Sequence, residues 1–83
     1  MKKTVLIIGG SGLIGKPLVN EYLKNNKVIN LDIKNLKLNN KNYYYEKVDL
    51  NNLGSIKNKI DNIFKNYKNI FSTINCSYPT GKS

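Results

Sequence analysis

The sequence predicts an α/β fold with a parallel sheet, and three observations carry this prediction. Short apolar runs alternate with stretches of helical period along the 83 residues. The first apolar run ends in a glycine-rich turn, residues 9–15, and the second ends in an acidic residue, Asp32. Because parallel strands are joined by right-handed crossovers, such alternation places helices on the faces of one sheet.

Four segments are expected to form strands. They are continuously apolar, as in strands covered on both faces, or rich in the aromatic and branched residues that favour strands. The connection between the second and third strands, residues 34–42, is polar and asparagine-rich, and it is either a short helical turn or an irregular crossover. The expected strands are residues 3–8, 28–33, 43–48 and 70–75.

Two segments, residues 13–25 and 53–67, repeat apolar residues at steps of three and four and are expected to form helices. Pro17 is tolerated near the start of the first helix because the first four N–H groups of a helix have no partner within it. Asn51 or Asn52 precedes the second helix and can cap it.

The glycine-rich turn has the pattern G-x-x-G-x-x-G, at Gly9, Gly12 and Gly15. The first glycine permits a tight reversal, the second lets a pyrophosphate approach the backbone, and the third lets helix and strand pack closely. The N–H groups that begin the helix then face the phosphates. The pattern predicts a dinucleotide site, and its alternative is a glycine-rich turn without a ligand.

Asp32 lies 20 residues after Gly12, which matches the spacing of about 20 residues expected for a carboxylate that binds ribose hydroxyls. Such a carboxylate would repel a 2′-phosphate, so we expect NAD as cofactor in preference to NADP. Lys34 is close enough in sequence to weaken that repulsion.

These patterns predict half of a Rossmann-type doubly wound sheet, with four strands in the order 3-2-1-4 and two main helices. Complete folds of this type contain two such halves, and 83 residues have room for one. We therefore expect residues 1–83 to form a single partial NAD-binding domain that is truncated before the catalytic and substrate-binding parts.

The chain contains 14 Lys and Arg residues against five acids, a net charge of +9. A basic surface can attract nucleic acid, but these lysines are spread singly and no arginine is present, so nucleic-acid binding is the less favoured interpretation. Cys76 is the single cysteine, which excludes an internal disulfide. No apolar run approaches the ~20 residues of a membrane span, and we expect a cytoplasmic protein.

Several segments together resemble the amino-terminal part of short-chain dehydrogenases/reductases, and the NAD-dependent epimerases and dehydratases of nucleotide sugars look nearest. These segments are residues 8–15, Asp32, residues 49–50 and residues 74–77. The resemblance implies pyrophosphate contacts from the glycine-rich turn, ribose contacts from Asp32, adenine contacts from residues 49–50, and contacts near the nicotinamide-side ribose from residues 76–77. The implied cofactor-binding residues are Gly9, Gly12, Leu13, Ile14, Gly15, Asp32, Asp49, Leu50, Cys76 and Ser77.

Catalysis in that family depends on a tyrosine and a lysine four residues apart on one helix. The chain has this spacing at Tyr43 and Lys47 and at Tyr78 and Lys82. The first pair falls on a predicted strand, and the second includes proline and glycine, which oppose a helix. We therefore predict no catalytic residue in this chain, and a nucleotide-sugar substrate would bind only if a missing carboxyl-terminal part is supplied. A non-enzymatic nucleotide-sensing or interaction module remains an alternative.

Overall fold

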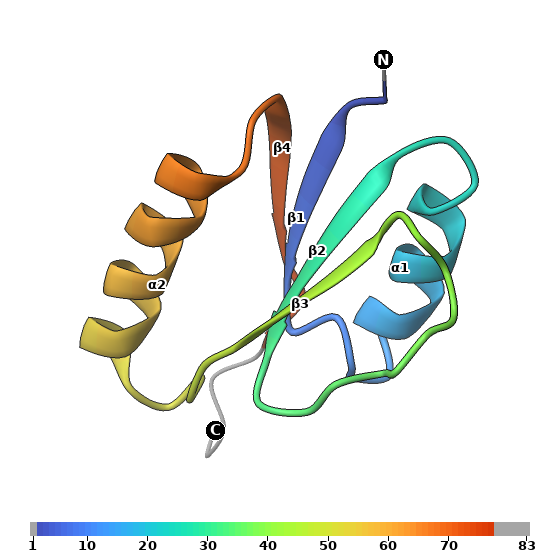
Figure 1. Cartoon of the computed structure of the whole chain (residues 1–83). Coiled ribbons are helices and arrows are strands. Elements are labelled where there is room, and N and C mark those ends of the chain that lie inside the picture. Colours follow the sequence, from blue (N-terminus) through green and yellow to red (C-terminus); the bar gives the residue numbers. More distant parts are fainter. Residues whose placement is uncertain (1, 78–83) are drawn as a thin grey trace.

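The computed structural model, which describes residues 2–77, consists of a four-stranded sheet with one helix on each face (Figure 1). All strands are parallel, and their order in the sheet is β3-β2-β1-β4. This order confirms the predicted half of a Rossmann-type sheet. The elements are β1 (Thr4–Ile8), α1 (Gly15–Tyr22), β2 (Lys27–Asp32), β3 (Tyr43–Lys47), α2 (Leu53–Asn66) and β4 (Ile70–Asn75).

The pairing register aligns the carboxyl ends of all four strands. Ile8, the last residue of β1, pairs with Leu31 of β2 on one side and with Asn75 of β4 on the other. Asp32, the last residue of β2, pairs with Lys47, the last residue of β3. The segments that follow the four strands therefore begin at one edge of the sheet, where open α/β sheets bind ligands.

The strands lie within one residue of their predicted bounds, but α1 is shorter than predicted. It begins at Gly15 rather than at residue 13 and ends at Tyr22. Its first predicted residues instead belong to the turn that leads out of β1. At the other end, Asn26 bonds the carbonyl of Tyr22 through both its backbone N–H and its side-chain amide, which closes the helix.

The second helix follows the prediction closely. Asn52 is its N-cap, and the side-chain Oδ1 of Asn52 accepts the Ser55 N–H at 3.0 Å. The connection between β2 and β3 was expected to be either a short helical turn or an irregular crossover. Residues 33–42 contain neither helix nor strand. The connection is an irregular crossover, in which Lys37 adopts a left-handed conformation with φ of 56°.

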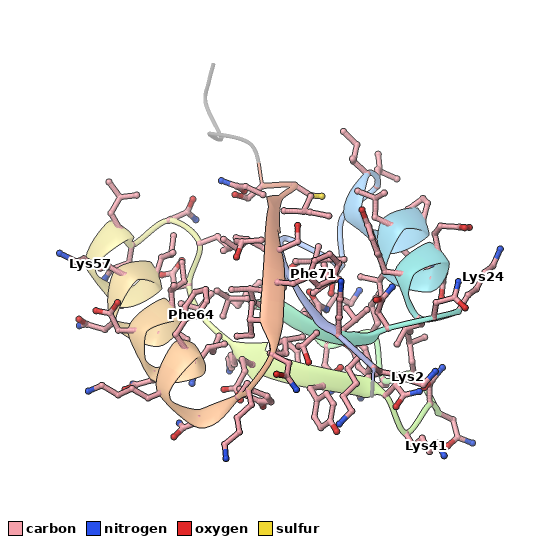
Figure 2. The ribbon with its side chains drawn as sticks, turned by 90° about the horizontal axis from the view of Figure 1, so that it is seen from above. Lys2, Lys24, Lys41, Lys57, Phe64 and Phe71 are labelled. Carbon is pink, nitrogen blue, oxygen red and sulfur yellow. The ribbon has the colours of Figure 1, made fainter. Side chains whose placement is uncertain are left out.

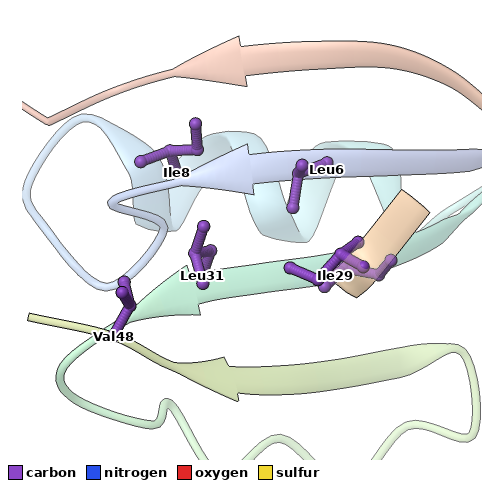
Figure 3. Packing of buried hydrophobic residues seen from close by; sticks show 6 residues of the cluster. Leu6, Ile8, Ile29, Leu31 and Val48 are labelled. Atoms are coloured by element: carbon purple, nitrogen blue, oxygen red, sulfur yellow. The ribbon is translucent and has the colours of Figure 1, made fainter. Parts of the chain in front are cut away.

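The hydrophobic core has two halves, one on each face of the sheet. On the α2 face, Ile63 packs with Leu6, Leu31 and the other cluster residues shown in Figure 3. On the α1 face, Val19 packs with alternate residues of the same strands, such as Val5. Because β1 is buried on both faces, its apolar run, residues 5–8, shows no alternation with polar residues, whereas β2 carries the buried polar residues Asn30 and Asp32.

A polar cluster joins α2 to the edge strand β3. The Tyr67 hydroxyl donates to Glu46 at 2.7 Å, and the Lys59 ammonium lies 3.2 Å from the other carboxylate oxygen of Glu46. The ring of Tyr67 meets that of Tyr44 edge to face. Burial, followed by the bond to Glu46, raises the pKa of Tyr67, so this hydroxyl remains a donor at neutral pH. The cluster fixes α2 at the end of β3.

The opposite edge strand, β4, is more exposed. Its residues alternate between half-buried and exposed positions, and Phe71 is 53% exposed with the Lys3 ammonium 5.0 Å from its ring. Lys57 of α2 and Lys24, two residues after the end of α1, point away from the sheet (Figure 2). No helix within residues 2–77 has the length and apolar character needed to cross a membrane.

The close contact between α1 and the turn predicts that Gly15 tolerates no side chain. A Cβ at this position would overlap with the Gly9 carbonyl oxygen and the Gly10 backbone. We expect Gly15→Ala to lower the free energy of unfolding by about 2 kcal/mol, measured by urea denaturation. Gly54→Ala in α2 is the control, because its Cβ meets only the Asn52 side chain at 3.5 Å. Equal stability of the two variants would contradict the proposed close packing.

Candidate functional site

A cavity of about 470 Å³ opens at the carboxyl edge of the sheet, within the range of roughly 300–1,000 Å³ common for ligand sites. Its walls come from the segments that follow each of the four strands, as the parallel register requires. The lining residues are Gly9, Gly12, Leu13, Ile14, Asp32, Ile33, Asp49, Leu50, Asn51, Cys76 and Ser77.

Two glycines of the turn are required by the geometry of the protein itself. Gly9 has a φ of +80°, which side chains rarely adopt, and a Cβ there would lie 2.9 Å from the Ser77 backbone nitrogen. The Gly9 N–H donates to the Leu31 carbonyl at 2.8 Å, so the reversal begins directly at the sheet. Gly15 lets α1 contact the Gly9 carbonyl. These observations match the predicted roles of the first and third glycines.

Gly12 is different because nothing in the protein excludes a side chain there. Its added Cβ would make only an ordinary contact, 3.6 Å from the Gly9 oxygen, and its φ is not in the left-handed region. Gly12 nevertheless lines the cavity. A glycine that packing does not require, at the wall of a cavity, leaves space for a ligand to approach the backbone.

The start of α1 adds a favourable field for an anion at this wall. Ile14, the N-cap residue, lines the cavity and makes no side-chain capping bond. The first N–H groups of a helix carry a partial positive charge, which attracts negative charge near the helix start. The turn and α1 together therefore provide a backbone surface suited to phosphate groups.

Asp32 is held firmly in the wall of the cavity. Asp32 is only 7% exposed, and both of its carboxylate oxygens accept backbone hydrogen bonds. Oδ2 accepts the Ser11 N–H at 3.0 Å, and Oδ1 accepts the Ile33 N–H at 2.7 Å. Because an ionised carboxylate offers about four acceptor positions, Asp32 retains capacity for two ligand hydroxyls.

Asp49 has a structural role in addition to its place in the wall. Its Oδ1 accepts the Asn51 N–H at 2.9 Å, and its carbonyl accepts the Asn52 N–H at 3.1 Å. These bonds form the turn that leads into α2. The same turn presents Leu50 to the cavity as an apolar surface.

The segment after β4 closes the remaining side. The Cys76 N–H donates to the Ile8 carbonyl at 2.7 Å, which extends the pairing of β4 with β1. Ser77 donates to the Asn75 side chain through its N–H at 2.9 Å and its hydroxyl at 2.6 Å. Burial raises the pKa of the Cys76 thiol, so it is a poorer nucleophile at neutral pH than an ordinary cysteine.

The cavity gathers nine of the ten residues that the sequence analysis assigned to a cofactor, and only Gly15 lies behind the wall. Two further lining residues, Ile33 and Asn51, were not predicted. The sequence indicates them only in that each directly follows a predicted residue, Asp32 or Leu50. Within residues 2–77, no group of His, Cys, Asp and Glu side chains is arranged to hold a metal ion.

The first of the two tyrosine–lysine spacings does not form a helical pair. Tyr43 and Lys47 are the first and last residues of strand β3. They therefore lack the shared helical face that the pair requires. The second spacing, Tyr78 and Lys82, lies outside the described residues.

Comparison with solved structures finds short-chain dehydrogenases. One, from Leptospira borgpetersenii serovar Hardjo-bovis with bound NAD+, aligns with a TM-score of 0.79 at 32% identity, over 95% of this chain and 32% of that chain. A short-chain dehydrogenase family protein from Francisella tularensis subsp. tularensis aligns with a TM-score of 0.74 at 34% identity, over 90% of this chain and 31% of that chain.

The present chain thus spans about a third of the length of these two proteins. No protein-family model matches the sequence, and no curated protein matches it. These solved structures resemble the chain in both fold and sequence. The comparison therefore supports the short-chain dehydrogenase superfamily as the class of this protein.

The raised pKa of Cys76 predicts slow alkylation of the folded chain. At pH 7.5 we expect iodoacetamide to modify Cys76 more slowly than in the urea-unfolded chain, because burial favours the neutral thiol. The rate should increase about tenfold per pH unit until the raised pKa is reached. Mass spectrometry of the modified chain measures both rates. Folded and unfolded rates that are equal at pH 7.5 would contradict this assignment.

Proposed function

We propose that this chain binds NAD at the cavity, as the cofactor-binding part of an enzyme of the short-chain dehydrogenase/reductase type. The observation that carries the proposal is that one cavity is lined both by Gly12, which packing does not require, and by the fixed carboxylate of Asp32. The solved structure with bound NAD+, at 32% identity, supports the choice of ligand.

Each wall of the cavity suits one part of the dinucleotide. The backbone of residues 9–15 and the start of α1 favour the pyrophosphate, and Asp32 accepts hydroxyl protons of the adenosine ribose. Leu50 and Ile33 provide apolar surface for the adenine ring. Residues 76–77 lie across the cavity from Asp32, on the side assigned to the nicotinamide ribose.

Asp32 also favours NAD over NADP. A 2′-phosphate would place negative charge beside the ionised carboxylate, and the two backbone bonds to Asp32 prevent the side chain from turning away. The Lys34 carbonyl accepts a bond from the Ser11 hydroxyl, which fixes the backbone of the segment just after β2.

The finer assignment is an NAD-dependent epimerase, dehydratase or reductase of nucleotide sugars, in which residues 1–83 form a partial NAD-binding domain. Bound NAD supplies a hydride acceptor, and the residues of this chain bind and orient it. Since residues 2–77 contain no tyrosine–lysine pair on a helix, substrate binding and proton transfer need residues beyond these. We therefore expect the 83-residue chain alone to bind cofactor without turnover.

Titration of the isotopically labelled chain with NAD and AMP, followed by NMR, tests this proposal. We expect shifts in residues 9–15 and at Asp32 for both ligands. Gly12→Ala is expected to weaken NAD binding about tenfold or more because its methyl group occupies the path of the pyrophosphate, while the stability of the fold is retained. Gly54→Ala in α2, which does not line the cavity, is the control. Absence of shifts at millimolar NAD in the unmodified chain would overturn the proposal.

Asp32→Asn tests the choice of cofactor. Replacing the charged acceptor by a neutral one should weaken NAD binding by about tenfold, because hydrogen bonds to charged groups are stronger by roughly 1–1.5 kcal/mol. Removing the repulsion should also narrow the difference between NAD and NADP affinities. Asp61→Asn on the exposed face of α2 serves as the matched charge control. Calorimetric titration measures the NAD and NADP affinities of the unmodified chain and of both variants, and an unchanged NAD/NADP affinity ratio in Asp32→Asn would contradict this role of Asp32.

A further inference from the structure

A buried amide lies directly beneath the glycine-rich turn. Asn30, in the middle of β2, is fully buried and packs on the α1 face of the sheet, where its strand neighbours are apolar. Within the described residues its Oδ1 has no hydrogen-bond partner, and a buried unpaired polar atom costs about 1–3 kcal/mol. A valine or leucine would fill this position without that cost, so the amide requires an explanation.

The amide nitrogen of Asn30 connects two segments that are distant in sequence. Its Nδ2 donates to the Ser11 hydroxyl at 2.9 Å and to the Tyr43 hydroxyl at 3.1 Å. Ser11 belongs to the glycine-rich turn, and Tyr43 begins β3. Both hydroxyls also bond the crossover that follows β2.

The direction of these bonds explains why an amide is needed. The Ser11 hydroxyl donates its only proton to the Lys34 carbonyl. The Tyr43 hydroxyl donates its proton to the Asn35 side chain at 2.8 Å and also accepts the Leu36 N–H at 3.2 Å. Each hydroxyl therefore presents an acceptor to position 30, and the two N–H groups of one amide match both.

These bonds hold the two walls of the cavity at a fixed separation. The turn contributes one wall, and the segment beginning at Asp32 and Ile33 contributes the next. Ser11 contacts this segment twice, through its N–H to Asp32 and through its hydroxyl to Lys34. Asn30 lies under both walls and fixes the rotamer of the Ser11 hydroxyl.

We propose that Asn30 is a positioning residue of the cofactor site, which ties residues 9–15 to residues 33–36 before the ligand arrives. This inference rests on the proposed NAD site for its functional consequence. Its structural content, the tie between the two segments, holds independently of any ligand. Preorganisation of this kind lowers the free-energy cost of ordering the site on binding.

Asn30→Leu tests the inference with an apolar side chain of similar size. The Ser11 hydroxyl keeps its bond to Lys34, and the Tyr43 hydroxyl keeps its bonds to Asn35 and Leu36. The substitution therefore leaves neither hydroxyl without a hydrogen-bond partner. Without the tie, we expect NMR hydrogen exchange of the Ser11 and Leu36 amides in the ligand-free chain to accelerate about five- to tenfold. The Gly9 amide, which donates to Leu31 within the sheet edge, is the internal reference and should not change.

Tyr43→Phe is a second variant that removes one hydroxyl without changing the space filled by the ring. We expect it to accelerate exchange at Leu36. Tyr45→Phe, on the same strand, is the matched control, because among the described residues the Tyr45 hydroxyl forms no hydrogen bond. If Asn30→Leu leaves the Ser11 and Leu36 exchange rates at the level of Tyr45→Phe, the inference is overturned, even where Tyr43→Phe accelerates exchange at Leu36.

Cofactor affinity separates this inference from the proposed function. If NAD binds the unmodified chain, Asn30→Leu should weaken NAD binding about five- to tenfold without loss of thermal stability, an outcome that a merely structural role would not give. Equal affinity would overturn the positioning role even though NAD binding stands. If NAD fails to bind the unmodified chain, the proposed function falls, and the ligand-free exchange rates still decide whether Asn30 ties the two segments.

Discussion

Parallel pairing of the four strands is the constraint on which the rest of the structure depends. Because Ile8 is aligned with both Leu31 and Asn75, four chain segments leave the sheet at the same edge. No single segment forms the cavity, and a slip of one register position would turn Asp32 toward the opposite face. The cavity is therefore a property of the sheet, whereas its chemistry comes from the residues at the strand ends.

The glycine-rich turn shows how one motif combines two kinds of requirement. Gly9 and Gly15 are needed for the backbone to reverse and for α1 to pack on it, whether or not a ligand is present. Gly12 has no such internal requirement. A glycine-rich turn can therefore be required for folding alone. The position that distinguishes a ligand site from such a turn is Gly12, where the packing of the protein itself would allow a side chain.

Most of the fold could be predicted from the sequence because apolar periodicity records which faces are buried. The alternation of elements predicted a parallel sheet, and the strand order followed from the interpretation of the chain as a nucleotide-binding half. The start of α1 was predicted two residues early, since the apolar period continues through Leu13 and Ile14 while the contact between Gly15 and Gly9 sets the actual start. The sequence could not decide between a helical turn and an irregular crossover for residues 34–42, because this segment also bonds Ser11 and Tyr43, which lie in other parts of the fold.

The candidate site was predictable where a motif or a strand end marked it, and not elsewhere. Asp32 ends an apolar strand, and the sequence shows this directly. Asn30 also stands in that strand, but its importance depends on Ser11 and Tyr43, which only the folded chain brings to it. Likewise, no sequence pattern predicts the hydrogen bond from the Ser11 N–H to the Asp32 carboxylate.

The position of Asn30 beneath Gly10 has a consequence for related sequences. A Cβ at position 10 would occupy the space of the Asn30 amide oxygen and would also press on Val19. Alanine at position 10 is thus compatible with this fold only where position 30 carries a shorter side chain. The two positions are expected to covary across homologues, and grafting the asparagine into a relative would require the accompanying glycine.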